Sequence, residues 1–146
     1  MKYVIEGNKN LKGEIRISGS KNSTMPILSA CLLINGKVRL SNVPNLRDIK
    51  TFFKIFNKIG VNVIKEADST YIIDSSSIKT GEITGDDIER VRGSQTLLGA
   101  LLSRFGSVTL PSLGGCQIGA RPIDLHLKGL KAMGAEASFI KGAIHL

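Results

Sequence analysis

The chain has 146 residues, of which 42% are hydrophobic and 22% charged, values typical of a folded globular domain with a sizeable core. The longest apolar run, Ile27 to Ile34, is far shorter than the roughly 20 residues that cross a bilayer. The N-terminal segment also lacks the apolar stretch of a signal peptide. These features argue against a disordered chain and against a membrane protein, and they favour a cytoplasmic location.

The formal net charge is +8, from 20 Lys plus Arg against 12 Asp plus Glu. Such a balance suggests nucleic acid as a partner, but the chain has five Phe, two Tyr, no Trp and no nucleic-acid reader motif. A solvated lysine-rich surface and a site for an anionic small molecule are the two other interpretations. The motifs below favour the anionic small molecule, and we expect no nucleic-acid or membrane partner.

The first predicted element is a helix that follows the small-residue turn Ser18–Ser20. Its apolar stripe consists of Ile27, Leu28, Cys31 and Leu32, and Asn35-Gly36 ends it. A short strand is expected at 38–40.

The next predicted helix begins near Asp48, whose charge suits a helix N-terminus, and ends before Gly60. Its helical spacing assigns one apolar set to the core: Ile49, Phe52, Phe53, Phe56 and Ile59. Strands at 61–64 and 71–73 then form a hairpin.

The same order of elements returns in the second half of the chain. Helices are expected at 96–105 and 123–133, and strands at 108–110, 135–140 and 143–146. Gly36-Lys37-Val38-Arg39-Leu40 resembles Gly106-Ser107-Val108-Thr109-Leu110, 70 positions later. We therefore predict an α/β (α+β) fold built from two βαβαββ units, 13–78 and 81–146, each opening with a strand.

Lys21-Asn22 stands where a turn leads into the first helix. The free N–H groups of a helix N-terminus attract anions, and a lysine beside them adds a positive charge. A capped helix with an exposed lysine is the alternative interpretation of this short motif.

A more specific motif runs from Gly114 to His126. Its glycines suit a loop that folds over a ligand, and Cys116 lies near Arg121 and a helix N-terminus, where a thiolate is favoured. Pro122 suits the first position of that helix, and Asp124 in its first turn could bind ligand hydroxyls. An incidental thiol beside an ordinary helix start is the alternative; a role for His126 stays open.

The two cysteines lie 85 positions apart in dissimilar surroundings, which argues against a disulfide. Cys31 belongs to the apolar stripe, where a thiol packs like a small hydrophobic residue. No Cys/His cluster has the spacing of metal ligands, and we expect no cofactor. Arg92 lies 70 positions after Asn22, so the two helix starts could face one cleft; a surface arginine is the alternative.

The motifs Gly19-Ser20-Lys21-Asn22, Arg92-Gly93-Ser94 and Gly114 to His126 resemble those of the UDP-N-acetylglucosamine enolpyruvyl transferases. The resemblance runs along essentially the whole chain. It implies two inverse α/β globules of repeated βαβαββ units with the substrates between them. It also implies transfer of the enolpyruvyl group of phosphoenolpyruvate to a UDP-sugar in peptidoglycan synthesis.

Carried over to this sequence, the resemblance implies a set of roles. Cys116 would be the proton donor and the target of fosfomycin. Lys21 and Asn22 would contact phosphoenolpyruvate. The residues implied for UDP-N-acetylglucosamine are Arg92, Arg121, Pro122, Ile123, Asp124 and Leu125. The related shikimate-pathway transferases usually carry serine after the lysine and lack the Cys loop, so Asn22 and Cys116 argue against them.

Members of the resembled family are much longer than this chain. We therefore expect the chain alone to expose apolar surface, to lack turnover and to need the remainder of the enzyme as a partner. A non-catalytic repeat module that binds an anion or assembles with itself is the alternative.

Overall fold

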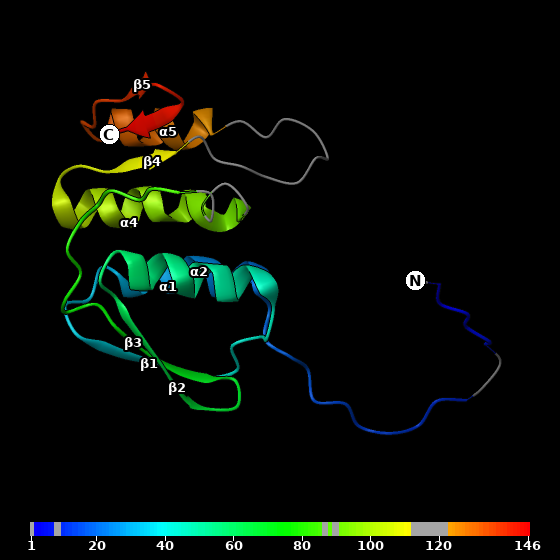
Figure 1. The fold of residues 1–146 in the computed structure, drawn as a ribbon. Helices are drawn as coiled ribbons and strands as arrows, with labels where there is room; N and C mark the ends of the chain where they lie inside the picture. Colours follow the sequence, from blue (N-terminus) through cyan, green and yellow to red (C-terminus); the bar gives the residue numbers. More distant parts are fainter. Residues whose placement is uncertain (1, 8–9, 86–87, 89–90, 112–122) are drawn as a thin grey trace.

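The computed structural model describes residues 2–7, 10–85, 88, 91–111 and 123–146. Two three-stranded sheets lie on opposite sides of a helical layer (Figure 1). Helices α1 (Lys21–Cys31) and α2 (Arg47–Lys58) cover the first sheet, and α4 (Thr96–Phe105) packs on α1 from the other side. The second sheet and α5 (Asp124–Ala132) lie beyond α4. The fold is thus of the mixed helix-and-sheet class predicted.

Helix α1 begins where the sequence predicts. Ser20 is its N-cap and accepts a hydrogen bond from the backbone N–H of Ser23. Leu28, Cys31 and Leu32 are buried as expected, whereas Ile27 is 48% exposed. The assignment of Ile27 to the core was wrong because the buried stripe of α1 includes Met25 in its place.

Helix α2 confirms the second apolar stripe. Ile49, Phe52, Phe56 and Ile59 are buried, and Asp48 lies in the first turn. Phe53 is partly buried against Tyr71 of the sheet, with ring centroids 4.7 Å apart. The phenylalanines therefore stabilise the core, as predicted, by joining α2 to its sheet.

The two sheets have the same topology. Strand β3 (Thr70–Asp74) pairs antiparallel with β1 (Lys37–Leu40) and with β2 (Asn62–Ala67). Strand β6 (Ala143–His145) likewise lies between β4 (Thr109–Pro111) and β5 (Ser138–Ile140). In each half the last strand is therefore central. The predicted strand 135–140 is shorter than expected and begins at Ser138.

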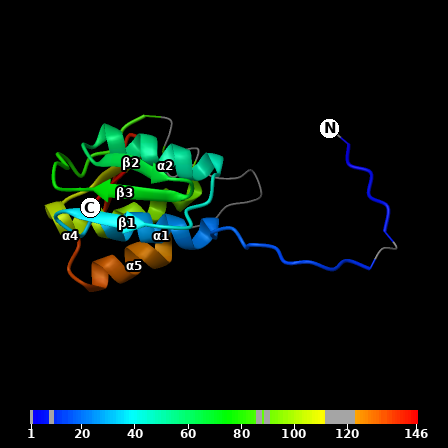
Figure 2. The same ribbon diagram turned by 90° about the horizontal axis from the view of Figure 1, so that it is seen from below.

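The expected opening strand of each unit is not formed in the described residues. Residues 10–20 form an extended, mostly exposed arm that runs away from the body (Figures 1 and 2). In the second half, Glu82 makes only an isolated parallel bridge to Thr109. Both predictions assumed that each half completes its own sheet, whereas the arm pairs with no strand in the described structure.

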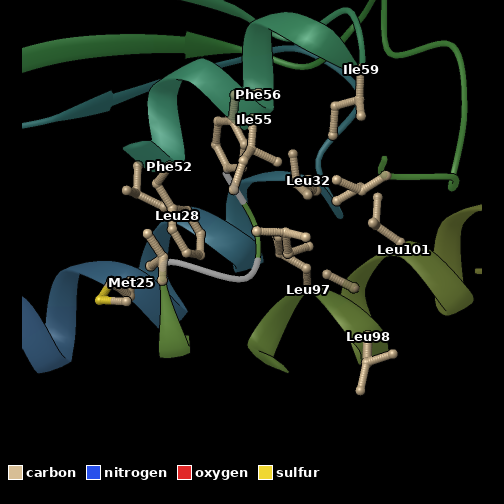
Figure 3. Close-up of a cluster of buried hydrophobic side chains, with 14 of the residues drawn as sticks. Met25, Leu28, Leu32, Phe52, Ile55, Phe56, Ile59, Leu97, Leu98 and Leu101 are labelled. Atoms are coloured by element: carbon tan, nitrogen blue, oxygen red, sulfur yellow. The ribbon is translucent and has the colours of Figure 1, made fainter. Parts of the chain in front are cut away.

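One apolar core joins the two halves of the described chain. Side chains of α1 and α2 meet those of α4, with Leu28 and Leu32 on one side and Leu97 and Leu101 on the other (Figure 3). Hydroxyls of Ser29 and Thr96 are also hydrogen-bonded, 2.6 Å apart. The halves therefore pack as one body.

No helix in the described ranges is both long and apolar enough to span a bilayer. Large apolar side chains are nevertheless exposed in several parts of the described chain, and ten of them lie in residues 3–17 and in the α5–β5 region. They are Tyr3, Val4, Ile5, Leu11, Ile15, Ile17, Leu125, Met133, Phe139 and Ile140. Exposed apolar surface is what we expected of a chain that needs a larger partner.

Candidate functional site

The helices share one direction. The N-terminal ends of α1, α2, α4 and α5 all lie toward the end of the body from which the arm departs (Figure 1). The preceding 3₁₀ helix η1 (Arg92–Gln95) enters α4 from the same end. Because each helix N-terminus carries partial positive charge, this end of the molecule favours anions. The predicted site residues Lys21, Arg92 and Asp124 each begin one of these helices.

The start of α1 is fixed by a close backbone approach. A side chain at Gly19 would lie 1.8 Å from the carbonyl oxygen of Asn42 and 3.0 Å from Pro44. The loop that contains Asn42 and Pro44 leads directly into α2. Gly19 therefore lets the start of α1 lie against the segment that leads into α2.

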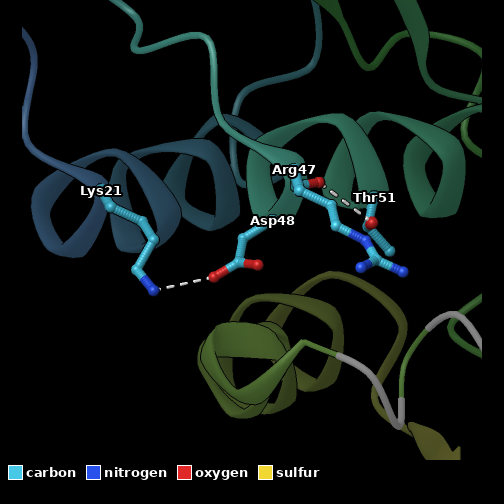
Figure 4. A network of polar contacts seen from close by, with 4 residues as sticks. All are labelled: Lys21, Arg47, Asp48 and Thr51. Atoms are coloured by element: carbon cyan, nitrogen blue, oxygen red, sulfur yellow. Dashed lines mark hydrogen bonds and ion pairs between the residues drawn. The ribbon is translucent and has the colours of Figure 1, made fainter. Parts of the chain in front are cut away.

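Lys21 forms an ion pair with α2. Its Nζ donates to Oδ2 of Asp48 at 2.8 Å, and both side chains remain partly exposed (Figure 4). Asn22, the other residue predicted to contact an anion, is exposed beside it. The structure therefore gives Lys21 a specific partner, which an unattached surface lysine would not have.

Sequence reasoning missed Arg47 and the second role of Asp48. Asp48 was assigned only to the helix start, and Arg47 was not considered. The guanidinium of Arg47 lies on the same side of α2 as the Lys21–Asp48 pair and points toward η1 and α4 (Figure 4). It has no carboxylate partner within the described ranges. The sequence offered one signal for both residues: Arg47 and Asp48 stand at the start of the second helix, as Lys21 and Asn22 stand at the start of the first.

In the second half, Arg92 begins η1, and its side chain lies outside the described part. The neighbouring Gly93 packs on α1, because an added Cβ would lie 1.9 Å from Cε of Met25. Ser94 is fully buried and donates its hydroxyl to the carbonyl of Ile88. The Arg92-Gly93-Ser94 motif therefore fixes the entry of α4 against the start of the first unit.

Helix α5 begins at Asp124, close to the predicted boundary. Ile123 is half-buried, and its carbonyl accepts the N–H of Leu127 in the first turn. Asp124 and Leu125 are exposed, Leu125 to 75%. Both are therefore accessible to a ligand or a partner, and His126 is exposed as well.

Cys116, Arg121 and Pro122 lie outside the described residues, so their predicted roles stay predictions. The segment that holds them joins β4 to α5, whose N-terminus lies at the same end as that of α1. The other cysteine, Cys31, is 3% exposed, and burial raises its pKa to about 11. Its thiol is therefore a core group and not a nucleophile at neutral pH.

The described residues thus bring positive charge from two helix starts to one end of the body. Such an arrangement can bind phosphate or carboxylate groups. Within the same ranges, no group of three or more His, Cys, Asp or Glu residues is arranged to hold a metal ion.

The chain is similar to known proteins along nearly its whole length. Residues 5–146 match the family model of EPSP synthase (3-phosphoshikimate 1-carboxyvinyltransferase). The chain is 43% identical to a UDP-N-acetylglucosamine 1-carboxyvinyltransferase of Cellvibrio japonicus and 46% identical to one of Trichlorobacter lovleyi. Each alignment covers 98% of this chain and 34% of the relative, so the chain spans about a third of their length.

A similar fold occurs in a solved structure, the enolpyruvyl transferase NikO from Streptomyces tendae. The TM-score is 0.77 at 27% sequence identity, over 95% of this chain and 30% of NikO. The arrangement of helices and sheets described above is thus that of part of an enolpyruvyl transferase.

Proposed function

Because the chain belongs to the EPSP synthase family, we propose that it forms the N-terminal third of a UDP-N-acetylglucosamine enolpyruvyl transferase. The observation that carries the proposal is the 43–46% identity, along 98% of the chain, to relatives that bear that name. The enzyme would act in the cytoplasm, at the first committed step of peptidoglycan synthesis. The choice of a UDP-sugar over shikimate phosphate rests on these relatives and on Asn22 and Cys116.

The proposed reaction is an addition followed by an elimination. The 3-hydroxyl of the sugar adds to C2 of phosphoenolpyruvate as C3 takes a proton, which gives a tetrahedral phospho-ketal. Loss of a proton from C3 and of inorganic phosphate from C2 then restores the double bond as an enol ether. No oxidation or reduction occurs, and the chain needs no cofactor for these steps.

Each proposed site residue has a role in these steps. Lys21 and Asn22 bind the phosphoenolpyruvate anion, and the positive helix ends stabilise charge that develops as phosphate leaves. Cys116 delivers the proton to C3 and can itself add to phosphoenolpyruvate. The UDP-sugar would contact Arg92, Arg121, Pro122, Ile123, Asp124 and Leu125.

The chain alone is proposed to lack turnover, because the opposing globule and its catalytic carboxylate belong to the other two thirds of the enzyme. A chimera tests this directly. Residues 1–146 replace the corresponding third of the Trichlorobacter lovleyi relative, and phosphate release is measured with both substrates. We expect phosphate release from the chimera, none from the isolated chain, and at least 100-fold less after Cys116→Ser, about the loss that removal of a general acid causes.

Fosfomycin supplies a second readout of the same proposal. An alkylating epoxide should add its mass to Cys116 of the chimera, in the presence of the UDP-sugar, and leave Cys31 unmodified. A folded chimera that releases no phosphate, or that is labelled equally at both cysteines, would contradict the assignment. Ligand binding without turnover in the chimera would favour the non-catalytic module instead.

A further inference from the structure

We propose that Asp48 is a positioning residue that holds the ammonium of Lys21 where the anionic substrate binds. This inference rests on the proposed function, because it takes the site at Lys21 to be a phosphoenolpyruvate site. The proposal gives Asp48 a task beyond that of a negative charge at the start of α2.

The place of this ion pair in the fold, and not its length, sets it apart from the exposed pairs of the first sheet, of which Arg39–Glu66 is 2.6 Å long and also spans 27 residues. The Lys21–Asp48 bond of 2.8 Å joins the first turns of two helices, 27 residues apart in sequence. The pair Lys65–Asp68, in contrast, is 3.2 Å long and links β2 to the turn that directly follows it, where Asp68 is fully exposed. Lys21 is thus held across an element boundary, at the end of the body where the helix N-termini gather.

The chemistry allows Asp48 and a substrate anion to share the lysine. An ammonium has three N–H donors, and Asp48 takes one in the described structure, so two remain for a phosphate or carboxylate. The negative charge of Asp48 is offset by Lys21, and the nearby Arg47 adds a cation on the same side of α2. The cluster of Lys21, Arg47 and Asp48 therefore keeps a net positive charge that can attract an anion.

A lysine without such a partner would sample many rotamers, and ordering them on binding would weaken the complex. Asp48 selects one direction for the side chain before the ligand arrives. Its effect should therefore depend on the acceptor oxygen more than on its charge. This distinction separates positioning from simple charge competition, in which any neutral substitution would tighten anion binding.

The test compares Asp48→Ala and Asp48→Asn in the full 146-residue chain, with Asp68→Ala as the matched control. The side-chain order of Lys21 is read from the splitting of its ε-methylene protons by NMR with ¹³C-labelled lysine. Phosphoenolpyruvate and inorganic phosphate are then titrated and followed at the same signal. We expect Asp48→Ala to collapse the splitting and to weaken phosphoenolpyruvate binding by about 3- to 10-fold. Asp48→Asn should keep the splitting and bind within about 2-fold of the wild type.

Three results would overturn the proposal. The first is an unchanged Lys21 signal in Asp48→Ala; the second is tighter binding in both Asp48 variants; the third is an Asp68→Ala variant that matches Asp48→Ala. In each of these cases a wild-type response of Lys21 to phosphoenolpyruvate would leave the proposed function standing. A wild-type Lys21 signal that ignores both anions would overturn the anion site and, with it, the role of Asp48.

Discussion

The chemical role of each of the two cysteines depends on its surroundings. Both were assigned from neighbours in the sequence, Cys31 to an apolar stripe and Cys116 to a glycine-rich loop. The assignment of Cys31 is confirmed: it is buried in α1, and its Sγ lies 3.2 Å from the carbonyl oxygen of Ile27. Burial disfavours the charged thiolate, so this residue should stay protonated across the pH range of most enzymes.

Stability at alkaline pH should report this burial. The pKa of Cys31 is raised from 9.0 to about 11 in the folded chain, so folding favours the neutral thiol. This contribution is constant below pH 9 and is lost as pH rises from 9 through 11, to a total of about 2 to 3 kcal/mol. Urea unfolding of the wild type and of Cys31→Ala, at pH 8 and pH 10.5 under reducing conditions, measures it.

Other groups also titrate in that range, but they titrate in both proteins. We therefore expect the wild type to lose about 2 kcal/mol more than Cys31→Ala between the two pH values. Equal losses would mean that the Cys31 thiol ionises freely in the folded state.

At the scale of elements, periodic patterns predicted most of the fold. The stripe of Ile49, Phe52 and Phe56 specified α2 because a helix buries residues three and four apart on one face. The prediction of opening strands was wrong because a strand forms only where a partner offers backbone hydrogen bonds. The alternating segment Glu14-Ile15-Arg16-Ile17 has no such partner in the described residues. Pairing between distant strands is a tertiary property that local spacing does not contain.

The site was predictable to a lesser extent for a related reason. Lys21 and Asp124 could be assigned to helix starts from local signals such as Ser20 and the nearby proline. The contact between Lys21 and Asp48 depends on how α1 and α2 pack side by side, which no local motif encodes. Only the repeated unit hinted that equivalent helix starts would gather at one end.

The close approach at Gly19 gives the element-scale prediction. In Gly19→Ala the new Cβ meets the backbone of Asn42, so α1 or the loop before α2 must move. We expect a loss of about 1 to 3 kcal/mol in the free energy of unfolding, measured by urea denaturation. Gly7→Ala is the matched control, because nothing lies within 4 Å of Gly7 and its effect should stay within about 0.5 kcal/mol. Equal effects of the two substitutions would contradict the packing described at the start of α1.

At the scale of the whole molecule, the two halves share a topology but not an equal degree of burial. Helix α2 buries four residues, whereas the described part of α5 buries only Leu127. Met133, which ends α5 as the buried Ile59 ends α2, is 77% exposed. The second half therefore depends more on its contacts with the first half for stability.

Arg104 is the main polar contact between the halves. From the last turn of α4 its guanidinium donates to the carbonyl oxygens of Leu32 at 2.6 Å, of Ile34 at 3.2 Å and of Ser75 at 2.8 Å. These carbonyls follow the end of α1 and of β3; those of Ile34 and Ser75 also accept the N–H groups of Gly36 and Ile78, whereas that of Leu32 accepts from Arg104 alone among the described residues. The side chain of Arg104 thus donates hydrogen bonds to backbone carbonyls just after α1 and β3, which belong to the first half.

Removal of that guanidinium should therefore loosen the second half first. We expect Arg104→Met to lower the free energy of unfolding by about 2 to 3 kcal/mol, because it leaves the carbonyl of Leu32 without a donor and removes a charged donor from those of Ile34 and Ser75. Amide hydrogen exchange should quicken more in β4 and β6 than in β1 and β3, as a unit that opens by itself. Arg39→Met is the control: its exposed pair with Glu66 should be worth less than about 1 kcal/mol. Uniform acceleration across both sheets would instead mean that Arg104 stabilises the chain as a whole and does not join its halves.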